Sequence, residues 1–441
     1  MISDLIAAVI NLARACLFQI CLAGMLVVFL VSGCSTQKAI TLMPKPVIYQ
    51  DSVIDPFAHL TPEHQSARTH VFYATNRAPR ISKRGLGYGN KVDSSLRLGE
   101  TIIRMGEPDT DWDELLALSL AEPQLEPVPL TVENVSEMAQ MPADAILMDR
   151  RLSLEQQKFI DAINIHLDKA IDKEIMVYVH GTKVDFENAV ILTAEIDHFA
   201  GRDFVGLAFS WPSHQNILYY MARIDVGRAL ESSSALTNLL ILLAEHTKAE
   251  HINVLAYSAG GKITSKALFE MRRAFPDLDS DGLRAKFRIA SVVFAAADVK
   301  IDVFLDRLPA ISELAEQVVL TVTDEDNALK AAERFMGGEV RVGDQAAEAI
   351  EEAFILDQEV SNVEIIDVSY GQYVRGFDIS GHHYWYRHPW MSSDIIFLMR
   401  TDLPPHRRGL SPTELEGIWY LSPEYPERIK EVAQEELKGQ W

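Results

Sequence analysis

The chain has 441 residues, of which 48% are hydrophobic and 24% are charged. This composition allows a sizeable buried core and argues against wholesale disorder. The formal net charge of −22 argues against nucleic acid as a partner, because binding phosphates requires a basic patch. The length exceeds that of an ordinary single domain, although one α/β fold can fill most of it.

The first 34 residues contain an apolar stretch and every cysteine of the chain, Cys16, Cys21 and Cys34. Residues 15–33 carry no charge, and the sequence VSGC at their end has the small residues that precede a signal-peptide cleavage site. This ending resembles a bacterial lipobox, in which the cysteine is acylated and becomes the mature N-terminus. We therefore expect a lipoprotein signal peptide over residues 1–33 and a lipid on Cys34.

The alternative is an uncleaved N-terminal membrane anchor, because an apolar stretch of about 20 residues can span a bilayer. In both interpretations residues 35–441 lie outside the cytoplasmic membrane. Ser35, which follows the lipobox cysteine, favours the outer membrane by the usual bacterial sorting pattern. We expect a lipid-anchored protein of the cell envelope that faces the periplasm.

Two terminal segments lack the pattern of a folded core. Residues 34–65 contain several prolines and no strong periodicity, which predicts a tether between the lipid and the folded body. Residues 401–441 are acidic and also contain prolines, which predicts a surface tail that ends in a helix.

Residues 66–170 are predicted to hold N-terminal strands and an acidic insertion. The expected elements are strands over 69–79 and 96–108, a surface loop or insertion over 107–150 and a helix over 153–171. Ser153 and Gln156 have the spacing of a capping box at the start of that helix.

The domain expected over residues 171–400 alternates apolar strands with helices. Strands are predicted over 174–181, 203–213, 251–261, 287–299, 316–326 and 362–370, and helices over 185–200, 229–249 and 262–275. Continuous apolar strands that alternate with helices indicate a mostly parallel sheet covered on both faces. The fold class is therefore α/β with an N-terminal extension, and its ligand site is expected at the carboxyl ends of the strands.

Ser258 lies where a predicted strand meets a predicted helix, in the sequence AYSAGG over residues 256–261. A nucleophile elbow of the form G-x-S-x-G needs small residues around the serine, because its turn is tight and strained. Alanine replaces the first glycine here. The helix that follows would offer N–H groups and a positive dipole end to an oxyanion. The alternative is a tight turn whose serine has no chemical role.

The sequence VHGTK over residues 179–183 ends an earlier predicted strand. In the same class of site, the loop after this strand supplies one oxyanion N–H, and the residue after the nucleophile supplies the other. We therefore expect Thr182 and Ala259 to provide the oxyanion N–H groups. His180 is expected to orient the loop and not to act as a base.

Four histidines follow Ser258 in the chain: His382, His383, His388 and His406. A triad of this class runs in the order serine, acid, histidine, and the sequence SGHHYW over 380–385 follows the last predicted strand. His382 and His383 are therefore the candidate bases. We expect no metal site at this pair, because no third ligand lies at metal spacing.

Two acids compete for the place beside the histidine. Asp298 ends the sequence VVFAAAD, and Asp326 lies in TDEDNAL after the next predicted strand. Either carboxylate could orient an imidazole and stabilise its protonated form. The later strand is the usual place for the acid, which favours Asp326.

With these residues assembled, the chain resembles a poorly characterised family of α/β-hydrolase-like bacterial proteins, many of them lipoproteins. The resemblance runs from about residue 69 to residue 395 and rests on VFYATNR, VYVHG, FSWPS, the Ser258 elbow, AAADV, TDEDNAL and SGHHYW, in that order. It implies an α/β-hydrolase fold and assigns Asp326 as the acid and His382 as the base. Asp298 is then a supporting or alternative acid.

The chain departs from the family pattern at two places. The family has His before the nucleophile and Met-Gly after it, where this chain has Tyr257 and Ala259-Gly260. Its oxyanion loop has an aromatic residue and Asn, where this chain has Thr182 and Lys183. These changes leave the expected triad intact and bear on substrate preference.

The sequence thus predicts a serine hydrolase, specifically a carboxylesterase, that uses Ser258, His382 and Asp326 on a small-molecule ester. The mechanism requires no metal and no cofactor. The alternative is a catalytically silent lipoprotein of the same fold that binds an envelope partner, since fold does not imply function.

Overall fold

The computed structural model describes residues 40–52, 54–83, 85–122, 126–146, 151–323, 342–343, 361–369, 383–401, 403–414 and 417–436. The chain divides into two compact units, Met1–Ile40 and Thr41–Trp441. Every helix and strand named below belongs to the second unit.

Among the described residues, one sheet of eleven strands runs in the order β10-β11-β9-β8-β7-β6-β4-β5-β1-β2-β3. Its strands are β1 (Arg68–Ser82), β2 (Gly85–Met105), β3 (Leu130–Pro142), β4 (Glu174–Val179), β5 (Val205–Ser210), β6 (His251–Tyr257), β7 (Ile289–Ala295), β8 (Ala315–Val322), β9 (Val363–Asp367), β10 (Ser411–Pro412) and β11 (Ile418–Tyr420). The central strands are parallel, whereas β2 and β3 pair antiparallel at one edge. The mostly parallel α/β sheet that the sequence predicted is confirmed.

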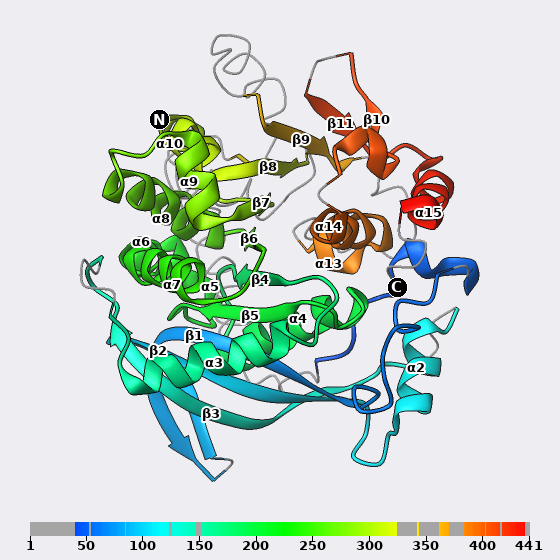
Figure 1. The fold of residues 1–441 in the computed structure, drawn as a ribbon, viewed down its shortest axis with the longest axis horizontal. Helices are drawn as coiled ribbons and strands as arrows, with labels where there is room; N and C mark the ends of the chain where they lie inside the picture. The colour runs from blue at the N-terminus through cyan, green and yellow to red at the C-terminus, as the bar shows by residue number, and fades with distance from the viewer. Residues whose placement is uncertain are drawn as a thin grey trace, which may run out of the picture. The chain divides into compact units, whose positions relative to one another are not determined.

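Helices cover both faces of the sheet. The main ones are α3 (Leu154–Leu167), α4 (Phe186–Phe199), α6 (Ile224–Glu231), α7 (Ser233–His246), α8 (Gly260–Ala274), α9 (Ser280–Phe287), α10 (Ile301–Leu314), α14 (Pro389–Thr401) and α15 (Tyr425–Glu436). Figure 1 shows α8, α9 and α10 on one side of strands β6, β7 and β8, and α14 on the other.

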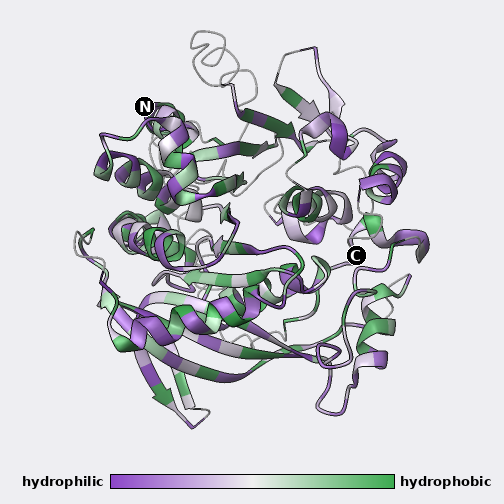
Figure 2. Cartoon of the chain, viewed as in Figure 1, coloured by the Kyte–Doolittle hydropathy of each residue, from purple (hydrophilic) through white to green (hydrophobic). Residues whose placement is uncertain are grey.

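The strand sequences explain this layering. In β4, Ile175 and Val177 belong to the core cluster that also contains residues of α3, α7, α8, α9 and α10. The alternate residues Met176 and Tyr178 are equally buried but point to the opposite face. Strands buried on both faces need continuous apolar runs, which is why the sequence predicted them well. Helix α15, in contrast, is coloured mainly hydrophilic in Figure 2.

The expected tether over 34–65 differs from the structure in its described part. Leu42, Met43 and Ile48 are buried, and Leu42 N–H donates to Val128 O at 2.8 Å. A short 3-10 helix, η1 (Val47–Ser52), places the Tyr49 ring against Phe199, with the ring centroids 6.4 Å apart. The prolines do not make this segment a linker, because its apolar side chains find a core to join.

The expected insertion over 107–150 is also more ordered than the sequence suggested. It contains α2 (Trp112–Leu120), which Asp111 caps, and strand β3, which pairs with β2. The expected C-terminal tail over 401–441 contributes β11, which pairs parallel with β9. A buried ion pair between Arg408 and Asp394, 2.9 Å apart, ties this region to α14.

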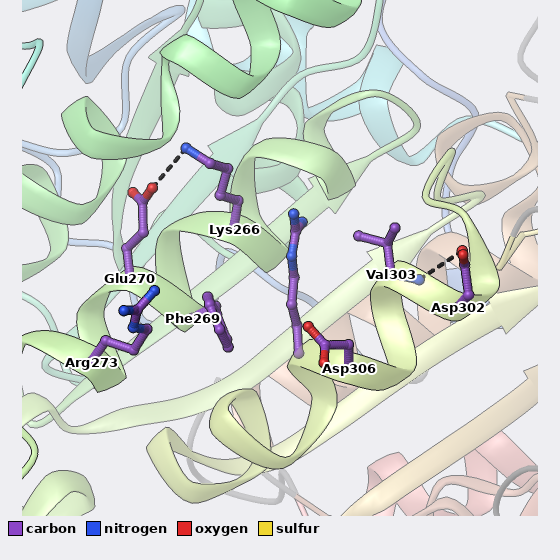
Figure 3. A pocket seen from close by; sticks show the side chains of 8 residues that line it. Lys266, Phe269, Glu270, Arg273, Asp302, Val303 and Asp306 are labelled. Atoms are coloured by element: carbon purple, nitrogen blue, oxygen red, sulfur yellow. Dashed lines mark hydrogen bonds and ion pairs between the residues drawn. The ribbon is translucent and has the colours of Figure 1, made fainter.

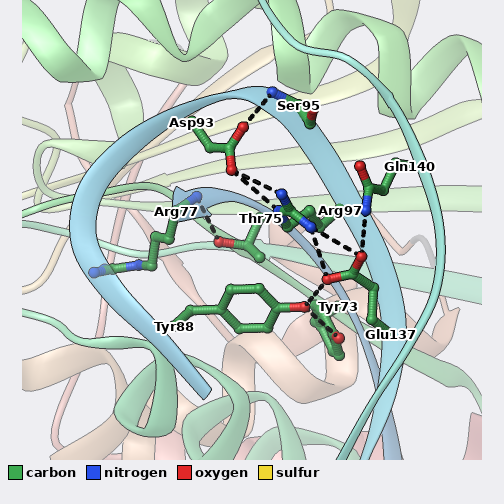
Figure 4. A network of polar contacts seen from close by, with 9 residues as sticks. All are labelled: Tyr73, Thr75, Arg77, Tyr88, Asp93, Ser95, Arg97, Glu137 and Gln140. Carbon is green, nitrogen blue, oxygen red and sulfur yellow. Dashed lines mark hydrogen bonds and ion pairs between the residues drawn. The ribbon is translucent and has the colours of Figure 1, made fainter. Parts of the chain in front are cut away.

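A network of polar side chains joins the antiparallel edge strands (Figure 4). Arg97 contacts Asp93 at 2.9 Å and Glu137 at 3.0 Å. Tyr88 donates to Glu137 at 2.8 Å, and its hydroxyl lies 2.9 Å from that of Tyr73. The network links β1, β2 and β3, the three strands between β5 and this edge of the sheet.

Candidate active site

Ser258 occupies the turn between β6 and α8, as the sequence predicted for a strand–turn–helix motif. Its φ angle is 52°, and its side chain is buried, with 4% of the residue exposed. A left-handed backbone is uncommon for a residue with a side chain and is held only where its surroundings impose it. This is the conformation that a nucleophile elbow requires.

The glycines around Ser258 allow other backbone segments to approach it. A Cβ atom on Gly260 would lie 2.2 Å from the carbonyl oxygen of Val179, at the end of β4. A Cβ atom on Gly181 would lie 2.9 Å from the Cβ atom of Ser258. The elbow and the loop after β4 therefore meet at a distance that only glycine permits.

Backbone hydrogen bonds hold the elbow to the end of β7. The Ser258 N–H donates to Ala295 O at 3.0 Å, and the Asp298 N–H donates to Ser258 O at 3.1 Å. The Gly261 N–H also donates to Ser258 O, at 3.0 Å. The left-handed turn is thus held on both sides by neighbouring strand and helix.

A buried ion pair lies beside the elbow. The ammonium nitrogen of Lys262, on the first turn of α8, is 2.8 Å from Asp298 Oδ1 and donates to the Tyr220 hydroxyl at 2.8 Å. The Tyr220 hydroxyl donates to Asp298 Oδ2. Both oxygens of the alternative acid Asp298 are therefore engaged. Neither Lys262 nor Tyr220 was predicted from the sequence to support the site. The available signal was a lysine among the small and apolar residues that follow Ser258, because a buried lysine needs an acidic partner.

His180 lies in the loop after β4 and is fully buried. Its ring stacks on Trp211, with the ring centroids 5.3 Å apart, and its Nε2 lies 3.3 Å from an Arg77 nitrogen. Burial, and next the charge of Arg77, hold the pKa of His180 well below its usual value. A neutral, stacked imidazole suits the loop-orienting role that the sequence analysis gave it.

Arg77 supports the same loop from β1. Its guanidinium donates to Val184 O at 2.7 Å and to the Ser210 hydroxyl at 2.9 Å. Burial lowers the pKa of Arg77 to about 9. The motif VFYATNR was noted in the sequence, but the role of its arginine became visible only in the structure.

Thr182 and Ala259 lie on the two segments that meet at Ser258. Thr182 follows Gly181, where a Cβ atom would collide with Ser258. The buried Thr182 hydroxyl has no hydrogen-bond partner among the described residues. Ala259 precedes the first turn of α8, where no side chain caps the helix. A helix N-terminus without a side-chain cap presents N–H groups that can receive negative charge.

His382, Asp326 and the expected lipidation site Cys34 lie outside the described residues. The residues that follow His382 in the chain lie close to the elbow. The ring of His383 is 6.2 Å from that of Tyr257, measured between centroids. The Tyr384 hydroxyl accepts from Ala296 N–H at 3.0 Å and lies 2.5 Å from the Thr321 hydroxyl, at the ends of β7 and β8.

Other features of the described residues lie away from Ser258. A hollow of about 510 Å³ between α8 and α10 is lined by side chains of both charges (Figure 3). Lys266 pairs there with Glu270 at 2.6 Å.

In the part of the chain that the structure describes, no helix is long and apolar enough to cross a membrane, and no cluster of three potential metal ligands is found.

The family of α/β hydrolases of unknown function, DUF900, matches residues 155–396 of this chain. The search of curated proteins found no match to this chain.

Among solved structures, a lipase-esterase related protein from Clostridium acetobutylicum is 11% identical over 53% of this chain and 96% of its own, with a TM-score of 0.28. Esterase B from Lactobacillus rhamnosis is 12% identical over 52% of this chain and 75% of its own, with a TM-score of 0.30. An acylaminoacyl peptidase from Pyrococcus horikoshii is 11% identical over 70% of this chain and 52% of its own, with a TM-score of 0.33. These likenesses are too remote to bear on the reaction.

Substituting Gly260→Ala should destabilise the protein, because the new Cβ atom meets the backbone oxygen of Val179 at 2.2 Å. We expect a loss of about 2 kcal/mol or more in the free energy of unfolding, measured by chemical denaturation. Gly227→Ala is the matched control, because its Cβ atom would have nothing within 4 Å. The packing argument is wrong if the two variants unfold at the same denaturant concentration.

Lys262→Met should cost about 3–5 kcal/mol of unfolding free energy, because it leaves the Asp298 carboxylate buried without its cation. The double variant Lys262→Met with Asp298→Asn should recover much of that loss. The control is Lys266→Met on the same helix, whose ion pair with Glu270 is partly exposed and should cost about 1 kcal/mol or less. Equal losses at the two lysines would contradict the assignment of a buried charge pair.

Proposed function

The chain belongs to the DUF900 family of α/β hydrolases of unknown function, and we propose that it is a serine hydrolase, specifically a carboxylesterase, with Ser258 as its nucleophile. The left-handed backbone of Ser258 between β6 and α8 is the observation that supports this most strongly. A serine held in this way directs its hydroxyl away from the backbone that surrounds it and toward the carboxyl edge of the sheet.

In the proposed reaction, the Ser258 oxygen attacks the carbonyl carbon of an ester while His382 accepts the serine proton. The resulting oxyanion receives hydrogen bonds from the N–H groups of Thr182 and Ala259. The tetrahedral intermediate then collapses, His382 gives its proton to the leaving alcohol, and an acyl-enzyme remains. His382 then takes a proton from water as the water oxygen attacks the acyl carbon. The second tetrahedral intermediate collapses to the carboxylic acid, and His382 returns the proton to the Ser258 oxygen.

The assignment of His382 as the base draws on its chain neighbours. Consecutive Cα atoms are about 3.8 Å apart, and the adjacent His383 packs near Tyr257, which precedes the nucleophile. The buried Tyr384 hydroxyl anchors the segment to the ends of β7 and β8. The family resemblance supports His382 over His383.

The assignment of Asp326 as the triad acid draws on the contacts of its rival. Asp298 already pairs with Lys262 and accepts from Tyr220, so a histidine would have to compete with a cation for its oxygens. Asp326 comes four residues after Val322, the last residue of β8, in the place that this fold uses for the acid.

We further propose that the protein is anchored in the cell envelope through a lipid on Cys34, on the periplasmic side of the outer membrane. The lipobox-like sequence VSGC supports this proposal. The mass of the mature N-terminal peptide tests it, because an unmodified Met1 terminus would contradict cleavage and acylation.

The purified chain should be labelled by a fluorophosphonate probe, because an activated serine attacks phosphorus as it attacks a carbonyl carbon. Ser258→Ala should abolish labelling, and His382→Ala should reduce the labelling rate by at least about 100-fold. His383→Ala is the matched control and should label at close to the wild-type rate. Asp326→Asn should slow labelling more than Asp298→Asn does.

A folded wild-type chain that stays unlabelled would contradict the proposal. It would favour a catalytically silent binding protein of the envelope, the function that the departures at the elbow and the oxyanion loop suggest. A larger effect of Asp298→Asn than of Asp326→Asn, with both variants equally stable, would instead transfer the role of the acid to Asp298.

A further inference from the structure

Large apolar side chains are exposed in a cluster after β5. Ile217, Leu218, Tyr219 and Ile224 are 39%, 53%, 42% and 46% exposed. They lie on α5 (Ile217–Met221) and at the start of α6, and we call them the α5–α6 patch. The other exposed large apolar residues of the described chain are scattered over several elements. Single exposed apolar residues are ordinary, whereas a group of them indicates a binding surface.

Two contacts attach the segment that carries the α5–α6 patch to the surroundings of the nucleophile. At the start of the segment, the Ser213 hydroxyl donates to Val184 O at 2.7 Å, in the loop that carries Thr182. Within α5, the buried Tyr220 hydroxyl donates to Asp298, whose own N–H bonds to Ser258 O at 3.1 Å. The segment is therefore attached both to the expected oxyanion loop and to the backbone that holds Ser258.

Side-chain contacts order the segment that carries the patch. The Tyr219 ring stacks on His214, with the centroids 3.9 Å apart. His214 in turn lies 2.6 Å from the buried carboxylate of Asp225. Asn216 caps α5 by accepting from Leu218 N–H at 3.0 Å. Tyr220 is buried, whereas Ile217 and Leu218 stay 39% and 53% exposed.

We propose that the α5–α6 patch binds the acyl chain of the ester that Ser258 attacks, so the preferred substrates are esters of medium- or long-chain, uncharged carboxylic acids. This inference rests on the proposed function of Ser258. An acyl chain is covalently bound to Ser258 in the acyl-enzyme, so it extends from the nucleophile over the adjacent surface. An apolar chain would remove the patch from water, whereas a short or charged acyl group would leave it exposed.

The test measures kcat/KM of the full-length chain on a series of p-nitrophenyl esters from acetate to decanoate. Each ester is kept below its critical micelle concentration, and the buffer and detergent are the same throughout. We expect kcat/KM to rise about threefold for each added methylene until the patch is covered. Ile217→Ser and Leu218→Ser should each lower kcat/KM for octanoate about tenfold, and more than for acetate. Ile165→Ser on α3, at a residue 56% exposed, is the matched control and should leave the profile unchanged.

The labelling rate of Ser258 by fluorophosphonates of increasing alkyl length gives the same information without turnover. Hydrolysis or labelling that is independent of chain length would overturn this inference and leave the proposed esterase intact. The inference would also be overturned if Ile217→Ser and Leu218→Ser changed only vesicle binding, or only the oligomeric state measured by light scattering. The patch would then contact a membrane or a second copy of the chain. Absence of both hydrolysis and labelling would overturn the inference together with the proposed function.

Discussion

The left-handed backbone of Ser258 is the constraint around which the centre of this molecule is organised. A residue with a side chain keeps a φ of 52° only where its surroundings exclude the alternatives. Here Ala295 and Asp298 hold its peptide groups, while Gly181 and Gly260 let β4 and its loop approach to within a distance that no Cβ atom allows. The order of the parallel strands β4, β6 and β7 brings these partners together.

Buried charges complete the support of this centre. Lys262 and Asp298 neutralise each other beside the elbow, with Tyr220 bound to both. Arg77 plays a comparable part for the loop after β4, where it bonds to a carbonyl and a hydroxyl. Burial of the His180 ring, and next the charge of Arg77, hold the pKa of His180 well below its usual value. Such groups are costly to bury and contribute only when their partners are in place, so they connect the geometry of the site to the integrity of the fold.

The sheet and the elbow could be predicted from the sequence because their signals are local. Continuous apolar runs indicate buried parallel strands, and small residues around a serine indicate a tight turn. The burial of Leu42 and the pairing of β11 with β9 could not be predicted, because both depend on contacts between residues far apart in the chain. The same holds for Tyr220, whose role depends on Lys262 and Asp298.

The most direct test of the central claim is a crystal structure of the chain after reaction with a phosphonate ester inhibitor. The account predicts a covalent bond between phosphorus and the Ser258 oxygen. It also predicts that the phosphonyl oxygen lies within about 3 Å of the N–H groups of Thr182 and Ala259, with the His382 ring beside the Ser258 oxygen. A phosphonate bound to another residue, or a phosphonyl oxygen directed away from both N–H groups, would contradict the account.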